Sequence, residues 1–296
     1  MSISEKLTQL NGIKQDIKQS LIDKGQAATD DMTEYSTLIS NISGSSDDSF
    51  KNEIEGNGNS VNLPNDLTKI RDYAFYYSNS LAVTSLPPGV TSIGIYAFYN
   101  CRNLALTSLP DGITSIGSQA FYNCRNLALT SLPAGITTID AESFCNCISL
   151  ALTSLPDSVT SISSNAFLGC SKLALTSLPA GLTTISICAF KGCSKLALTS
   201  LPDGITSIGN QAFYNCRDLA LTSLPAGITN IDSTAFYYCY SLKTLTFKGI
   251  PTKISSSAFT NCMNLTTINV PWSEGAVANA PWGATNATIN YNYVGE

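Results

Sequence analysis

Cysteines and acidic side chains are the groups in this sequence that could do chemistry, because the chain contains ten cysteines and no histidine. The lack of histidine removes the commonest general base and the usual zinc ligand. Eight of the cysteines stand 23 residues apart, from Cys101 to Cys262, which is not the CxxC spacing of a metal or redox pair. This spacing predicts a row of buried thiols in a repeating core, where cysteine behaves as a small apolar residue.

Two cysteines, Cys145 and Cys188, lie outside this row. Cys145 and Cys147 could in principle form a redox-active pair, and the alternative is that Cys145 is an incidental substitution. Some acidic residues are near neighbours with no catalytic partner implied, namely Asp140 with Glu142 and Asp47 with Asp48. We find no nucleophile, phosphate-binding loop or metal-ligand set in the sequence. We therefore expect a protein that is not an enzyme and that needs no cofactor or metal.

A 23-residue repeat organises most of the chain. Nine phenylalanines share one phase of this period: Phe75, Phe98, Phe121, Phe144, Phe167, Phe190, Phe213, Phe236 and Phe259. An isoleucine stands five residues before each of them, and a leucine stands six residues after. Apolar residues at a fixed phase mean that each unit is one coil whose inner face is buried only by its neighbours. The sequence therefore predicts nine stacked coils with ladders of Phe, Leu and Cys inside.

Each unit divides into two extended pieces and two turns. Triplets such as Pro110-Asp111-Gly112 predict one turn, because Pro fixes φ and Gly accepts a positive φ. We expect a strand before this turn (LALTSL) and a second extended piece after it (ITSI). The Ala-Phe-x-x-Cys segment is expected to form a helical turn on the other side of the coil. Leu104, Leu106 and Leu109 are spaced by two and then three, which predicts a bulge between the last two.

These residues resemble the BspA-like leucine-rich repeats. The pattern of Leu-Pro, a turn, Ile-Gly, Ala-Phe and a Cys before Leu is matched unit by unit from about Phe50 to Pro271. The resemblance implies a leucine-rich-repeat solenoid of short parallel β-strands and helical turns. It also implies a protein-binding or surface-adhesion scaffold, of a kind found on bacterial cell surfaces, in some protists and in phage structural proteins.

Other segments flank the repeats. We divide the chain into residues 1–42, 43–49, 50–270 and 271–296. Residues 1–42 are expected to form an α-helical hairpin that serves as an attachment or oligomerisation module, or that merely packs on itself. Residues 43–49 are expected to be a linker. Residues 50–270 would form the solenoid with its N-terminal cap, and residues 271–296 a C-terminal cap. Trp272 and Trp282 are expected to cover the far end of the solenoid. The apolar stripe of the first helix consists of Ile3, Leu7, Leu10, Ile17 and Leu21.

The flanks are similar to parts of phage tail and fibre proteins. The opening SEKLTQLNGIKQDIKQSLIDKG resembles the start of many such proteins, and VPWSEGAVANAPWGATNATINYNY resembles the closing module of phage-borne copies of these repeats. The sequence shows neither a Sec signal nor an LPxTG-type anchor, which a bacterial surface adhesin would need. This resemblance implies a virion protein made in the host cytoplasm, such as a tail-fibre or receptor-binding component. Its residues 1–42 would contact other virion proteins or form a homotrimer. A bacterial BspA-like adhesin on the cell surface, and a virion decoration or baseplate spacer without a ligand, are the alternatives.

Composition limits the partners. The net charge is −5, only 12% of residues are charged and no basic cluster is evident along the sequence, which argues against nucleic acid and against an anionic membrane surface. No segment approaches the roughly 18 consecutive apolar residues of a membrane span. The expected partner is a host cell-surface protein or glycan.

The variable positions of the repeat suggest where that partner binds. The two residues after each Phe, and the two after each Cys, are rich in Tyr and Arg, which recur at binding hot spots. We expect stacked coils to align them in a stripe along one edge; the alternative is that they only cover that side of the solenoid. The candidates are Tyr76, Tyr77, Tyr99, Arg102, Tyr122, Arg125, Tyr214, Arg217, Tyr237, Tyr238 and Tyr240. The hydroxyls of Thr107, Ser108, Thr130 and Ser131 mark a second candidate surface on the strand face.

Overall fold

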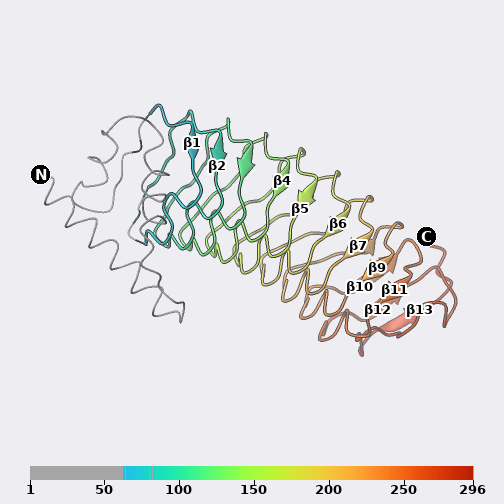
Figure 1. Cartoon of the computed structure of the whole chain (residues 1–296). Helices are drawn as coiled ribbons and strands as arrows, with labels where there is room; N and C mark the ends of the chain where they lie inside the picture. The colour runs from blue at the N-terminus through green and yellow to red at the C-terminus, as the bar shows by residue number, and fades with distance from the viewer. Residues whose placement is uncertain (1–62, 64, 80, 82, 296) are drawn as a thin grey trace, which may run out of the picture.

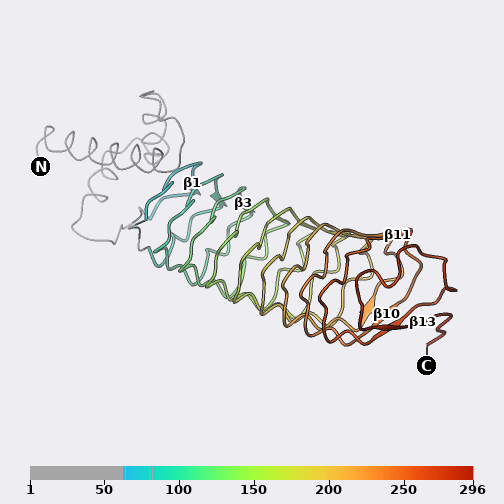
Figure 2. The same cartoon turned by 90° about the horizontal axis from the view of Figure 1, so that it is seen from below.

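The computed structural model describes residues 63, 65–79, 81 and 83–295. They form an elongated stack of coils, and each coil lies beside the one before it in the sequence (Figure 1; Figure 2). The helical hairpin predicted for residues 1–42 and the linker at 43–49 lie outside the described residues. The predicted assembly stripe lies there too: Ile3, Leu7, Leu10, Ile17 and Leu21.

The extended piece after the Pro turn forms a two-residue strand in each coil, as predicted. The strands are β1 (Lys69–Ile70), β2 (Ser92–Ile93), β3 (Ser115–Ile116), β4 (Thr138–Ile139), β5 (Ser161–Ile162), β6 (Thr184–Ile185), β7 (Ser207–Ile208), β9 (Asn230–Ile231) and β11 (Lys253–Ile254). They follow one side of the solenoid, and the strands that pair with one another there are parallel (Figure 1). Ile70 pairs with Ile93, so residues one 23-residue repeat apart lie opposite each other in neighbouring strands. The isoleucines therefore stack inside the core.

The piece before the Pro turn is a strand only toward the C-terminus. There, β8 (Ser223–Leu224), β10 (Thr244–Phe247), β12 (Thr267–Asn269) and β13 (Thr288–Asn290) form a second parallel sheet in the order β13-β12-β10-β8. The strand predicted at LALTSL is wrong for the earlier coils, where the chain bends at Thr107. Thr107 and Ser108 both face solvent between the buried Leu106 and Leu109, which breaks strand alternation without a bulge in a ladder. In β10, Leu245 and Phe247 are buried two residues apart and fit a strand.

The Ala-Phe-x-x-Cys segment is not helical. The described residues contain no helix, so the predicted helical turns are wrong. In the second coil, Tyr96 and Asn100 take φ values of 56° and 62° on either side of Phe98, and these left-handed residues interrupt a helix. The Phe98 amide donates to the Ala120 carbonyl of the next coil at 2.7 Å, and the Asn100 amide donates to Tyr122 at 2.7 Å. The Ala-Phe-x-x-Cys segments lie along one side of the solenoid, the turn side. Their backbone hydrogen bonds form a second series of links between coils.

Two ladders hold the core together. The rings of consecutive phenylalanines stack 5.0 to 5.6 Å apart and within 17° of parallel. The thiol of Cys124 donates to the carbonyl of Phe98 at 2.9 Å, which also accepts the Cys101 amide of its own coil at 3.1 Å. The same thiol bond recurs at Cys101, Cys147, Cys170, Cys193, Cys216, Cys239 and Cys262. The predicted row of buried cysteines is confirmed, and each thiol fixes its coil to the previous one.

At the C-terminal end of the solenoid, a tryptophan continues the ladder of phenylalanines by one repeat. Trp282 stands 23 residues after Phe259, whose amide donates to the Trp282 carbonyl at 2.9 Å. Trp272 and Trp282 are buried, and their rings lie 5.3 and 6.0 Å from that of Phe247. The two tryptophans therefore cover the end of the core, in a tenth coil that includes β13.

Candidate functional site

The tyrosines of the predicted binding surface gather in two clusters on the turn side. The N-terminal tyrosine cluster comprises Tyr73, Tyr76, Tyr77, Tyr96, Tyr99 and Tyr122. The C-terminal tyrosine cluster comprises Tyr214, Tyr237, Tyr238 and Tyr240. The sequence predicted one stripe. The structure divides it, because Cys145, Leu168 and Lys191 occupy the equivalent positions of the coils between Tyr122 and Tyr214.

The rings in these clusters stack on one another. Tyr99 lies 5.0 Å from Tyr76 and 4.6 Å from Tyr122 between ring centroids, and Tyr214 lies 5.0 Å from Tyr237 at an interplanar angle of 6°. Stacking turns the ring faces toward neighbouring rings. The half-buried side chains therefore offer a partner their edges and hydroxyl groups, at intervals set by the coils.

The phenol groups remain protonated hydrogen-bond donors. Burial raises the pKa of Tyr99 from 10.0 to about 12, and the neighbouring tyrosines and the Glu142 carboxylate add to this. Burial likewise raises the pKa of Tyr76 and of Tyr122. The pKa of Tyr237 is raised mainly by its hydrogen bond with Tyr238.

The three predicted arginines are exposed and held in place. Their Nε groups donate to the asparagine two residues earlier: Arg102 to Asn100 at 3.2 Å, Arg125 to Asn123 at 2.9 Å, and Arg217 to Asn215 at 2.9 Å. These asparagines are also the left-handed residues of the turn. Among the described residues we find no bond to the outer guanidinium nitrogens, which are the pair that grips a carboxylate.

Three members of this surface, Tyr73, Tyr96 and Lys191, were not predicted from the sequence. Tyr73 and Tyr96 stand two residues before a Phe and stack at 4.9 Å, while the prediction included only residues that follow a Phe or a Cys. Their spacing of 23 residues was the available indication. Lys191 was also missed, although its Nζ lies 5.0 Å from the centroid of the Tyr214 ring and donates to Gln211 Oε1 at 2.7 Å.

Cys145 and Cys147 are not bonded to each other, since both are free thiols. Cys145 occupies a tyrosine position of the repeat, and burial, with Glu142 nearby, raises its pKa to about 12. The Cys147 thiol donates to the Phe121 carbonyl at 2.9 Å, and all ten cysteines are free thiols. Burial raises the pKa of the partly exposed Cys188 as well, against the opposing effect of Lys191. A thiol with a raised pKa is a poor nucleophile, which favours the incidental-substitution interpretation of Cys145.

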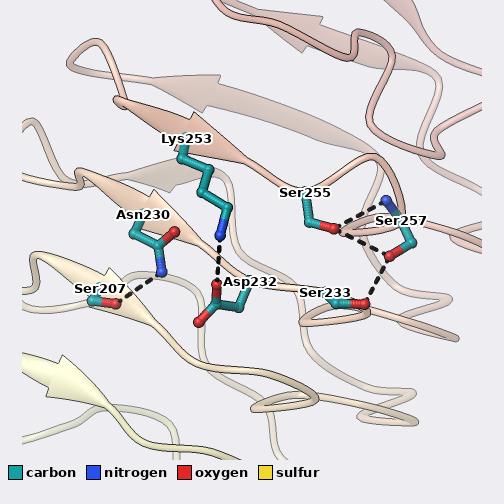
Figure 3. A network of polar contacts seen from close by, with 7 residues as sticks. All are labelled: Ser207, Asn230, Asp232, Ser233, Lys253, Ser255 and Ser257. Carbon is teal, nitrogen blue, oxygen red and sulfur yellow. Dashed lines mark hydrogen bonds and ion pairs between the residues drawn. The ribbon is translucent and has the colours of Figure 1, made fainter.

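Polar groups elsewhere link neighbouring coils. Figure 3 shows Lys253 reaching Asp232 at 3.6 Å and the hydroxyls of Ser233 and Ser257 at 3.0 Å, on successive coils near the C-terminus. No group of acidic or cysteine side chains in the described part of the chain could hold a metal ion. Within the same residues, none of the secondary structure is a helix long and apolar enough to cross a membrane.

Comparison with solved structures agrees with the fold. A leucine-rich repeat protein from Bacteroides ovatus superimposes with a TM-score of 0.54 at 22% identity, over 78% of this chain and 68% of that one. A leucine-rich repeat protein of T. pallidum is 33% identical with a TM-score of 0.47, over 55% of this chain and 79% of its own. A leucine-rich cell surface protein from Faecalibacterium prausnitzii is 26% identical with a TM-score of 0.38, over 73% and 80%. The first of these shows that the chain has the leucine-rich-repeat fold.

The sequence comparison identifies the type of repeat. The model of the BspA type leucine-rich repeat region matches residues 45–174 and 163–279, which is most of the chain. A search of curated proteins finds no match. The Phe, Ile, Leu and Cys ladders described above are the structural counterpart of the matched pattern. The chain belongs to the BspA type leucine-rich repeat family.

Proposed function

We propose that this chain is a binding protein without enzymatic activity, which recognises a macromolecule on a cell surface through the turn side of its solenoid. The observation that carries the proposal is the alignment of two stacked tyrosine clusters with three exposed, oriented arginines. Tyrosine and arginine are enriched among the residues that dominate binding energy. Stacked rings and bonded guanidinium groups are already ordered, so that binding costs little further side-chain entropy.

The reactive groups support a role without catalysis. The ladder thiols donate to backbone carbonyls inside the core, and burial raises their pKa values. The tyrosine hydroxyls keep their protons because the pKa values of Tyr76, Tyr99 and Tyr122 are raised. These side chains act in packing and hydrogen bonding.

The setting of the solenoid forms a second part of the proposal. The likeness of residues 4–42 and 270–293 to phage proteins supports a tail-fibre or receptor-binding component of a virion, displayed for host attachment. Membership of the BspA type family supports a bacterial surface adhesin instead. Fractionation distinguishes the two: the first places the native protein with phage particles, and the second with the cell envelope.

Binding of the labelled full chain to a panel of bacterial and epithelial cells tests the function. We expect the double variant Tyr99→Ala with Tyr122→Ala to lose roughly 30-fold or more in affinity, the scale of a hot-spot loss. Tyr99→Phe with Tyr122→Phe keeps the stack and removes only the hydroxyls, which separates hydrogen bonding from packing. The matched control is Thr107→Ala with Thr130→Ala, two exposed side chains in the segment before the Pro turn.

Two outcomes would contradict the proposal. If the chain binds none of the cells and does not assemble with phage proteins, it has no display function of this kind. If the threonine variant weakens binding and the tyrosine variant does not, recognition belongs to the hydroxyl-bearing segment before the Pro turn.

A further inference from the structure

The turn side also brings together positive charges that lie far apart in the sequence. We define the basic strip as the residues Arg102, Arg125, Lys172, Lys191, Lys195 and Arg217. The strip runs past both tyrosine clusters and over the coils between them. From this placement we infer that the basic strip binds an acidic segment of a partner protein, whose Asp and Glu side chains pair with the arginines and lysines. The inference rests on the proposed binding function and names the partner's chemistry.

Charge is distributed unevenly over the molecule. The whole chain has a net charge of −5, whereas the strip contributes six cations. In these coils Asp140, Glu142 and Asp218 are the carboxylates outside the Pro turns, three against the six cations of the strip. Glu142 accepts a hydrogen bond from Gln119 at 2.7 Å, and Asp218 pairs with Lys195 at 2.9 Å. The other aspartates of these coils, such as Asp111, stand in the Pro turns. A positive surface on an acidic protein favours an anionic partner and speeds its association.

The strip has a geometry that suits carboxylates. Because each arginine Nε is bonded to an asparagine, the guanidinium plane is fixed and its outer nitrogens are oriented for a bidentate carboxylate contact. The coils span roughly 25 Å from Arg102 to Arg217, at about 4.8 Å per coil. Between the clusters the turn positions hold short residues, Gly169, Ser171, Gly192 and Ser194. A partner backbone can approach the strip closely at these coils.

The aromatic geometry favours a protein over other polyanions. Nucleic acids and sugars bind tyrosines largely through open ring faces, and these rings already stack on each other. A protein partner needs only ring edges, hydroxyls and cations. A second copy of this chain is disfavoured on this surface, because two identical strips would place lysines against lysines.

Fluorescence anisotropy with the full chain and a labelled peptide of alternating glutamate and serine tests the inference. We expect the peptide to bind, and added salt to weaken it. The triple variant Lys172→Gln, Lys191→Gln and Lys195→Gln is expected to lose about tenfold in affinity, through three partly exposed charge contacts. The control variant removes the same charge elsewhere: Lys243→Gln, Lys248→Gln and Lys253→Gln. It should bind the peptide as the unaltered chain does.

The inference is overturned if the peptide does not bind, or if both triple variants weaken binding equally. It is also overturned if polygalacturonate or single-stranded DNA displaces the peptide at a lower concentration than free peptide does, or if the full chain self-associates through the strip and the lysine variant abolishes this. The cell-binding assay separates this inference from the function. If the strip variant binds cells normally while the Tyr99→Ala, Tyr122→Ala variant does not, the binding function stands and the acidic partner is wrong.

Discussion

Mild alkali should unfold this solenoid, because its core contains a ladder of protonated thiols. In the folded chain burial raises the pKa of each ladder cysteine above its ordinary value of 9.0, so the thiols stay neutral there. In the unfolded chain the same thiols ionise near pH 9. The ladder's contribution to stability is therefore fully present below pH 9 and is lost as the pH rises above it.

The size of the effect follows from the number of thiols. Six of them are fully buried: Cys124, Cys147, Cys170, Cys193, Cys216 and Cys239. At pH 10 ionisation stabilises the unfolded chain by roughly 1 to 2 kcal/mol for each thiol, and by roughly 6 to 12 kcal/mol for the six. That sum is comparable to the whole free energy of unfolding of a typical domain, about 5 to 15 kcal/mol.

Urea unfolding followed by circular dichroism between pH 7 and pH 10, with a reductant present, measures this loss. The variant Cys170→Ala with Cys193→Ala lacks two of the six thiols and should lose about a third less stability over the same pH range. Its lower stability at pH 7 does not affect this comparison, since only the change with pH is used. If the free energy of unfolding at pH 10 stays within about 1 kcal/mol of its value at pH 7, the thiols are not the buried proton donors described here.

Four further outcomes are expected. Phe167→Ala, in the middle of the ring stack, should cost about 3 to 5 kcal/mol in urea unfolding. Thr234 is β-branched at a φ of 51°, so Thr234→Gly should leave stability unchanged or raise it by up to about 1 kcal/mol in the same assay, and Thr234→Val should not raise it. A maleimide should label Cys188 first in the native protein, and all ten cysteines only in denaturant, as mass spectrometry would show. Deletion of residues 157–179, one repeat between the clusters, should preserve the fold by circular dichroism. It should also weaken binding of any partner that contacts both clusters.

The core could be predicted from the sequence because one period determines it. Phe98, Ile93 and Cys101 recur at a fixed phase, and only stacking buries them, so the ladders and the parallel register follow directly. The helical turn was a wrong prediction because Ala-Phe-x-x-Cys has a spacing that also suits one helical turn. The contrary indication was the asparagine or glycine two residues after most of the phenylalanines, as at Asn100 and Gly169, since these residues tolerate a positive φ.

The candidate surface was harder to predict because its residues are neighbours only across coils. The tyrosines that follow a Phe or a Cys were identified, whereas Tyr73 and Tyr96 were not. The division into two clusters depends on single residues such as Leu168 and Lys191, which carry no pattern of their own. The basic strip showed no cluster along the sequence because Arg125 and Lys172 lie two repeats apart. Stacking brings such residues to within roughly 10 Å along the axis, at about 4.8 Å per coil.

The separation between core and turn side explains how one fold can present different surfaces. Phe, Ile, Leu and Cys fix the register of every coil, so the residue after each Phe can be Tyr99, Leu168 or Lys191 without altering the backbone pattern around it. Each substitution at that position then acts on the surface alone, at a place along the axis that its repeat number determines. Between Tyr122 and Tyr214, this position holds Cys145, Leu168 and Lys191 instead of tyrosine. These three substitutions interrupt the row of stacked rings and place a cation within it. The binding properties of this solenoid therefore depend on the order of its near-identical repeats as much as on their number.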